Sequence, residues 1–320
     1  MLSQAIVTEF LSSVTQQIKQ LYPSALWFGE AAVSGSLSGF LKLFGVSAAA
    51  FVILIAVLQK YFVAICSALK GTTAKNNYKM QRLSKSSPVR ALWGRELRRY
   101  FASSIYVTNT IVGYLLMALA PAMMLIVGQE KLSEMEAAMG IPHLIVKAMP
   151  FLLAFLGALM PTTCCSVSME GKQWWIAKSL PVSSKMIFDS KILVNLTIAA
   201  PFYVIGVMLA MLAVRPTLTE GVWIMLIPAV YILFTAVAGI TVNLALPVLT
   251  WENETRVVKQ SASVAICMLL GTVSVLPPFG FLFVFGGAQD VVMLLTAAVL
   301  LVITAVLYRY NNEKQLTHIR

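Results

Sequence analysis

Seven stretches of the chain are almost continuously apolar, and polar segments separate them. A helix of about 20 apolar residues spans the hydrocarbon core of a bilayer, so each stretch predicts a transmembrane helix. The predicted spans are residues 43–66, 104–127, 148–168, 192–214, 222–247, 261–277 and 291–308. Pro277 and Pro278 remove two amide donors, and we expect them to break the sixth span and turn the chain back to the outer face.

Two further segments carry apolar residues on one helical face only. Residues 1–23 predict an amphipathic helix and lack the basic start, apolar core and cleavage site of a signal peptide. Residues 24–41 are rich in Gly, Ser and aromatic residues and predict a loop or interfacial segment. Residues 88–101 predict a helix capped by Ser87, whose apolar face includes Trp93. We expect Arg95, Arg98 and Arg99 to point away from that face, toward the membrane surface.

The composition agrees with a membrane protein. The 320 residues are 59% hydrophobic and 12% charged, with a mean hydropathy of +0.82. A soluble domain has roughly 45–50% apolar and about 25% charged residues. The predicted fold class is therefore an all-α polytopic membrane protein with seven transmembrane helices.

The net charge of +11 comes from loops beside the apolar stretches, which favours positive cytoplasmic loops over nucleic-acid binding. If the basic segment 67–103 is cytoplasmic, 19 of the 24 Lys and Arg residues lie on that side and five on the other. This bias predicts a cytoplasmic C-terminus and an outer N-terminus. The acidic segment 128–147 then forms an outer loop.

The sequence offers little sign of catalytic chemistry. Cys66, Cys164, Cys165 and Cys267 lack metal-ligand spacing, and we interpret them as reduced packing residues. His143 and His318 have no ligand partners nearby in sequence. Gly171 and Lys172 lack the remainder of a nucleotide-binding P-loop, and no Asp or Glu lies inside a predicted span. We therefore expect no enzyme activity and no cofactor in this chain, and an external source of energy.

Residues 170–183 join two predicted spans and alternate charged with aromatic side chains. The segment contains Glu170, Lys172, Trp174, Trp175 and Lys178, and Pro181 interrupts it. Such a pattern is typical of a short helix that lies along the membrane face, with tryptophans at headgroup depth and lysines toward anionic lipid or a partner protein.

Two motifs resemble the ABC-2-type exporter permeases of Gram-positive bacteria. The first is Glu170-Gly171-Lys172, Trp175-Ile176 and Lys178-Ser179-Leu180-Pro181, with Lys191 beyond it. The second is the segment 87–101 followed by 105–110. The resemblance implies a location in the bacterial cytoplasmic membrane. It also implies a cytoplasmic coupling helix that rests on a separate ATPase dimer, which would bind ATP and Mg²⁺. It assigns coupling to Glu170, Gly171, Lys172, Trp174, Trp175, Lys178, Ser179, Leu180 and Pro181. It also implies an interfacial elbow helix with Trp93, Arg95, Glu96, Arg98 and Arg99.

The family module has six spans, so residues 88–310 would form it. On this interpretation residues 1–42 are an extracytoplasmic segment, 43–66 an extra span, 67–87 a cytoplasmic linker and 311–320 a cytoplasmic tail. The chain would then be the C-terminal half of a two-module permease that pairs with a second module or with another copy of itself.

Several polar residues occur within the predicted spans, namely Asn109, Thr162, Thr163, Asn195 and Asn243. They could line a translocation path, or they could form hydrogen bonds between helices. Two other functions remain open. One is a non-transport membrane protein, such as an immunity factor or scaffold, on a degenerate permease fold. The other is an ion-coupled carrier, which would need an ionisable residue or a broken helix near the bilayer midplane.

Overall fold

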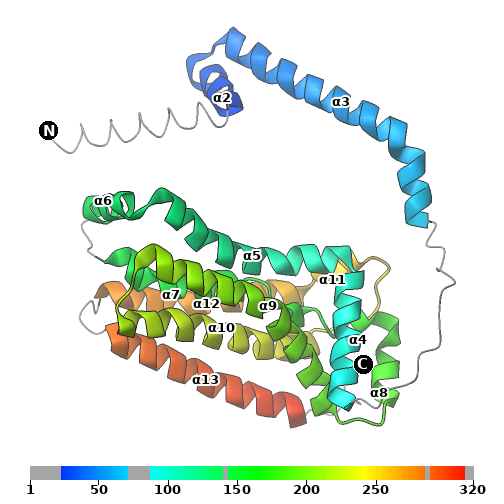
Figure 1. Cartoon of the computed structure of the whole chain (residues 1–320). Helices are drawn as coiled ribbons and strands as arrows, with labels where there is room; N and C mark the ends of the chain where they lie inside the picture. Colours follow the sequence, from blue (N-terminus) through cyan, green and yellow to red (C-terminus); the bar gives the residue numbers. More distant parts are fainter. Residues whose placement is uncertain (1–22, 71–86, 140–142, 285–288, 314–320) are drawn as a thin grey trace. The chain divides into compact units, whose positions relative to one another are not determined.

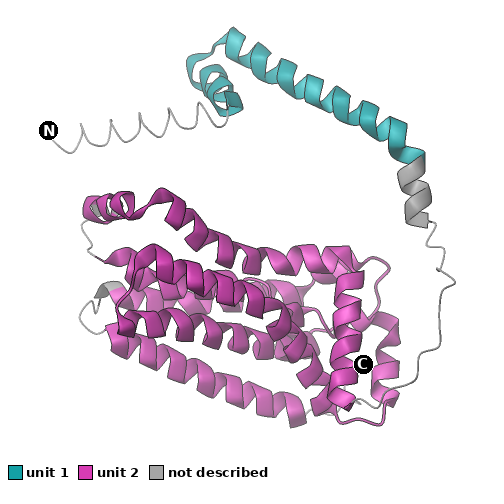
Figure 2. Ribbon diagram, in the orientation of Figure 1, with its two compact units in different colours: residues 1–83 teal, residues 84–320 magenta. Residues whose placement is uncertain are grey.

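The structure is a computed structural model that describes residues 23–70, 87–139, 143–284 and 289–313 (Figure 1). Within these residues the regular elements are all helical, and seven helices are long and apolar enough to cross a membrane. The protein is an all-α polytopic membrane protein, which confirms the predicted fold class. The chain divides into two units at residues 83 and 84, within the predicted linker 67–87 (Figure 2).

The first unit contains two described helices, α2 (Pro23–Ser34) and α3 (Leu37–Lys70). The segment predicted as a loop or interfacial segment is therefore helical, and only two residues separate its helices. Gly35 adopts a φ of +60°, which suits glycine and turns the chain between α2 and α3. At Gly39 a Cβ atom would lie 3.0 Å from the Trp27 carbonyl oxygen, so glycine allows the helices to pack closely. The amphipathic helix predicted over residues 1–23 lies almost wholly outside the described residues.

The second unit begins with α4 (Pro88–Ala102), and the predicted start of this helix is confirmed. The Ser87 hydroxyl accepts a hydrogen bond from the Arg90 amide, and Pro88 occupies the first helical position. Ser103 then caps α5 (Ser104–Val127), whose bounds are those predicted. The predicted outer loop contains a helix, α6 (Gln129–Met139), before α7 (Leu144–Ala158).

The chain after α7 is irregular and includes two short 3₁₀ helices, η1 (Thr162–Cys164) and η2 (Ser168–Gln173), and then α8 (Trp174–Ser179). The remaining helices are α9 (Ser184–Val214), α10 (Leu218–Ala245), α11 (Glu254–Val258), α12 (Ala262–Val284) and α13 (Gln289–Glu313). The long helices of the second unit form a bundle with α4, α8 and α11 at one end and α6 at the other (Figure 1). Helix α10 is the most buried span and packs against α7, α9, α12 and α13.

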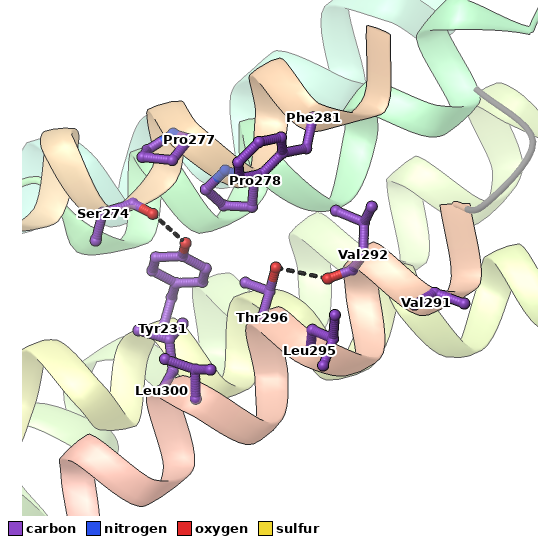
Figure 3. Close-up of a pocket in the computed structure, with 11 residues that line it drawn as sticks. Tyr231, Ser274, Pro277, Pro278, Phe281, Val291, Val292, Leu295, Thr296 and Leu300 are labelled. Carbon is purple, nitrogen blue, oxygen red and sulfur yellow. Dashed lines mark hydrogen bonds between the residues drawn. The ribbon is translucent and has the colours of Figure 1, made fainter. Parts of the chain in front are cut away.

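Helix α12 continues through Pro277 and Pro278 to Val284, so the predicted break in the sixth span is wrong. Pro278 has no amide hydrogen for the carbonyl of Ser274, four residues earlier. The buried Tyr231 of α10 supplies the missing donor, because its hydroxyl lies 2.8 Å from that carbonyl oxygen (Figure 3). A side chain from a neighbouring helix thus compensates for the proline, and the helix can continue.

Candidate functional site

The irregular segment between α7 and α8 is the most unusual feature of the second unit. The helix predicted across residues 148–168 ends at Ala158, and residues 161–171 are nevertheless buried. Backbone N–H and C=O groups without helical partners are costly inside a membrane unless the protein itself supplies partners. The side chains that surround this segment supply them.

Four carbonyl groups of the segment accept hydrogen bonds from other elements. Tyr106 of α5 donates to the Thr162 carbonyl at 2.6 Å, and Ser263 of α12 donates to the Cys164 carbonyl at 2.6 Å. The Trp251 indole donates to the Ser168 carbonyl at 2.8 Å. The Ser166 carbonyl accepts from both Arg99 and Lys191 at 3.1 Å.

Two asparagines bind the amide groups of the same segment. The Asn195 side-chain oxygen accepts from the Thr162 amide at 2.7 Å and from the Tyr114 hydroxyl at 2.9 Å. The Asn243 side-chain oxygen accepts from the Val167 and Ser168 amides at 2.8 and 3.1 Å. Of the polar residues predicted for a translocation path, Thr162, Asn195 and Asn243 thus form hydrogen bonds between elements.

The other two path candidates behave differently. Thr163 is fully buried, and its hydroxyl has no hydrogen-bond partner among the described residues. Asn109 is half-buried and donates to the Ile105 carbonyl of its own helix at 2.7 Å. A role for any of the five in translocation stays a prediction.

Next to the irregular segment lies a group of five charged side chains, Arg95, Glu96, Arg99, Glu170 and Lys191, which we call the ion cluster. Lys191 of α9 is fully buried, and its Nζ lies 2.9 Å from carboxylate oxygens of both Glu96 and Glu170. Arg95 lies 3.0 Å from Glu96 and 2.9 Å from Glu170. Arg99 pairs with Glu96 and lies 2.7 Å from Glu170. The cluster therefore joins α4, η2 and α9.

The ion cluster contradicts the prediction that Arg95 and Arg99 point toward the membrane surface. Glu96 shares the buried face of α4 with Leu92 and Tyr100, and Arg95 and Arg99 turn toward the two carboxylates instead of the membrane surface. Arg98 does face outward, and its guanidinium donates to the Gly94 carbonyl. Burial acts to lower the pKa of Arg99, but the carboxylates of Glu96 and Glu170 outweigh it and raise the pKa. Trp93 donates to the Thr197 hydroxyl of α9 at 3.1 Å.

Gly171 separates the buried part of the predicted coupling segment from its exposed part. Its φ of +57° and ψ of −139° are strained for any residue with a side chain. A Cβ atom here would also lie 3.1 Å from the Trp251 ring. This turn leaves Glu170 inside the ion cluster and directs Lys172 to the surface.

The two tryptophans of α8 have opposite environments. Trp174 is 3% exposed and packs with Ala177, Ile187 and Phe188 in a hydrophobic cluster. Trp175 is 65% exposed and Ile176 is 38% exposed. Lys178, Ser179 and Pro181 are exposed, and Leu180 is half-buried. Of the predicted coupling residues, Glu170, Gly171 and Trp174 are thus buried in this chain, while Lys172, Trp175, Lys178, Ser179 and Pro181 are exposed.

Comparison with known proteins adds no relative, because no family model, curated protein or solved structure matches this chain. The described residues also contain no group of three or more His, Cys, Asp or Glu side chains that could hold a metal ion. Cys164, Cys165 and Cys267 are buried and free. His143 is exposed and adopts a left-handed φ of +58° before α7.

The sequence analysis missed the pairing of Glu96 with Lys191 and the donors Tyr106, Trp251 and Ser263. One signal for the pairing existed, since each residue interrupts an otherwise apolar helical face. Glu96 lies four residues from both Leu92 and Tyr100, and Lys191 lies between Ile187 and Val194 on the buried side of α9. A charged residue at such a position needs an opposite charge nearby.

Proposed function

We propose that this chain is the transmembrane subunit of an ATP-driven exporter of the ABC-2 type in a bacterial cytoplasmic membrane. A separate ATPase dimer would bind ATP and Mg²⁺ and dock on α8. One observation carries the proposal. Helix α8 exposes apolar side chains at the end of the bundle, and the side chains on its opposite face pack against α9. The sequence resemblance of residues 170–181 supports the same function.

The exposed face of α8 has the chemistry of a docking surface. Trp175 and Ile176 present apolar area, and the exposed Lys172 lies one turn before them. Tryptophan is enriched among the residues that dominate binding energy at protein interfaces. The described residues contain no ion-pair partner for Lys172. An acidic side chain on the ATPase would complement it.

The buried face of α8 provides a route for mechanical coupling. Trp174 and Ala177 pack on the first turns of α9, through Ile187 and Phe188. Glu170, at the start of the same segment, pairs with Lys191 of α9 and with Arg95 and Arg99 of α4. A displacement of α8 by the ATPase would therefore move α9 and α4 together with it.

The distribution of charges supports the orientation that we propose for the subunit. Among the described residues of the second unit, α4, α8, α11 and the start of α9 contribute eight Lys and Arg residues at one end of the bundle. The end with α6 contributes three, Lys131, Lys147 and Arg215. By the positive-inside rule, this distribution supports the proposed location of α8 and the C-terminus in the cytoplasm, where the ATPase would be.

An ion-coupled carrier fits the structure less well. The irregular segment is a broken helix, which could hold a cation through its carbonyl groups. However, the carbonyls of Thr162, Cys164, Ser166 and Ser168 already accept hydrogen bonds from this chain. The scaffold alternative differs from a permease only in lacking ATPase-driven transport, so the experiment must measure both association and activity.

The test uses Trp175→Ala in the full chain, co-expressed with the ATPase that affinity purification and mass spectrometry identify. We expect normal expression of the variant with loss of both co-purification and stimulated ATP hydrolysis. Phe101→Ala is the matched control, because Phe101 is 63% exposed and lies outside α8. If Trp175→Ala together with Ile176→Ala still co-purified with the ATPase and stimulated it, α8 would not be the docking site.

A further inference from the structure

A groove on the membrane-facing side of the second unit combines a long apolar wall with one polar end. It lies between α9 and α13, over α10, and has a volume of about 520 Å³. Its apolar wall is formed by Ile192, Leu193, Leu233, Val237, Leu301 and Ala305. Leu193 and Leu301 are each more than 40% exposed on membrane-spanning helices. The groove therefore opens toward the bilayer.

The polar end of the groove contains an aspartate that forms no ion pair with the described residues. The Tyr308 hydroxyl of α13 donates to the Asp189 carboxylate of α9 at 2.8 Å. The half-buried Asp189 has no Lys or Arg within 4.0 Å in the described part of the chain. Val89, in the first turn of the interfacial helix α4, borders the same end. The carboxylate thus lies at the level where the spans meet the membrane surface.

A cation is nevertheless close to this end. The Lys185 ammonium lies 6.0 Å from the centre of the Tyr308 ring. Tyr308 is also the residue whose hydroxyl donates to Asp189. The groove therefore offers an acceptor for a positive group and an apolar channel, and the Lys185 ammonium near its polar end offers a donor for a negative group. A half-buried carboxylate at a membrane boundary is stabilised by an ammonium that also donates hydrogen bonds.

We propose that this groove binds one phospholipid whose headgroup carries a primary ammonium. The ammonium contacts Asp189, the phosphate contacts Lys185, and one acyl chain lies along the apolar wall. A lipid with an anionic headgroup, such as phosphatidylglycerol, would bring hydroxyl groups and a net negative charge to Asp189. Charge complementarity therefore selects a zwitterionic lipid over an anionic one.

A second groove in the same unit shows what such recognition requires. It lies between α12 and α13, with Tyr231 of α10 at its floor, and has a volume of about 490 Å³ (Figure 3). None of the described residues that line it is charged. The hydroxyls of Tyr231 and Thr296 are both used, because they donate to the carbonyls of Ser274 and Val292. This surface can accept acyl chains but has no group to select a headgroup.

The headgroup is tested with Asp189→Asn in the full chain. Native mass spectrometry of delipidated protein would measure binding of phosphatidylethanolamine and of phosphatidylglycerol with the same acyl chains. We expect one tightly held phosphatidylethanolamine on the parent protein and an affinity lowered at least about tenfold in the variant. Asp290→Asn is the control, because Asp290 also lies near the start of a span and accepts a hydrogen bond from Trp223 at 2.6 Å. Equal binding of both lipids by the parent, or unchanged binding by Asp189→Asn, would overturn the proposal.

The acyl channel is tested with Ala305→Phe, which fills the groove and leaves Asp189 in place. We expect it to lose the bound phosphatidylethanolamine at unchanged melting temperature. Val302→Phe is the matched control on the same helix, because Val302 is 63% exposed and does not line the groove. Retention of the lipid by Ala305→Phe would also overturn the proposal. The inference rests on the membrane-spanning fold alone, so a failure to find an ATPase partner would leave it intact.

Discussion

Replacing Lys191 with methionine tests whether the ion cluster holds α4, η2 and α9 together. Lys191 is fully buried, and the Glu96 and Glu170 side chains that it contacts are 6% and 4% exposed. Methionine fills a similar volume but leaves both carboxylates without their closest buried cation. Removing one partner of a buried ion pair costs about 3–5 kcal/mol. Arg95 and Arg99 remain beside the carboxylates, so we expect the lower end of that range.

The assay is the free energy of unfolding of purified protein in detergent, measured by chemical denaturation. Lys131→Met is the control, because Lys131 is exposed on α6 and makes no ion pair within the described residues. A surface substitution of this kind changes the free energy of unfolding by at most about 0.5 kcal/mol. The double variant Lys191→Met with Glu170→Gln removes one cation and one anion. We expect it to be more stable than the sum of the single effects predicts, by about 0.5–3 kcal/mol. Additive single effects, or a Lys191→Met variant as stable as the parent, would refute the proposed role of the cluster.

Three further outcomes are expected. Gly171→Ala should lower stability by about 1–3 kcal/mol in the same denaturation assay, because its φ of +57° and the Trp251 ring both oppose a Cβ atom; a neutral effect would mean that the turn can relax. Tyr231→Phe should lower stability by about 1–3 kcal/mol, because the Ser274 carbonyl loses its donor; a Tyr106→Phe variant gives a comparison at a second capped carbonyl. For topology, single cysteines are introduced at positions 134 and 76 in a background without native cysteines. The cysteine at 134 should react with an impermeant reagent in intact cells, and the cysteine at 76 should not. Labelling at 76 would contradict the cytoplasmic placement of α8.

The spans were predictable because apolar length alone determines them. Local signals also worked where the partner is a near neighbour in sequence, as when Ser87 caps α4 three residues away. The end of α7 was not predictable in this way, because residues 159–165 remain mostly apolar. The chain can leave the helix there because Asn195, Asn243 and Ser263 bind its backbone groups. These three residues belong to three later helices.

In the candidate site, too, the sequence predicted which positions matter, and contacts between distant helices determined what each side chain does. The exposed character of Trp175 agrees with its position in an interfacial segment, but nothing local distinguishes it from Trp174. Their difference arises from the hydrophobic cluster that α9 presents to only one side of α8. Likewise, Glu96 and Lys191 are 95 positions apart, and their pairing depends on how α4 crosses α9. Residue type suggested each position, and tertiary packing decided its role.

The capped irregular segment also constrains the order in which this protein can be assembled during synthesis. The chain emerges from the ribosome N-terminus first, so residues 159–173 are made before α9, α10 and α12. The Thr162 amide lacks its partner until Asn195 has been synthesised, the Val167 amide until Asn243, and the Cys164 carbonyl until Ser263. Exposure of such groups to lipid is costly throughout that interval. The polar groups of this segment can therefore be fully paired inside the protein only after α12, the sixth of the seven spans, has been synthesised.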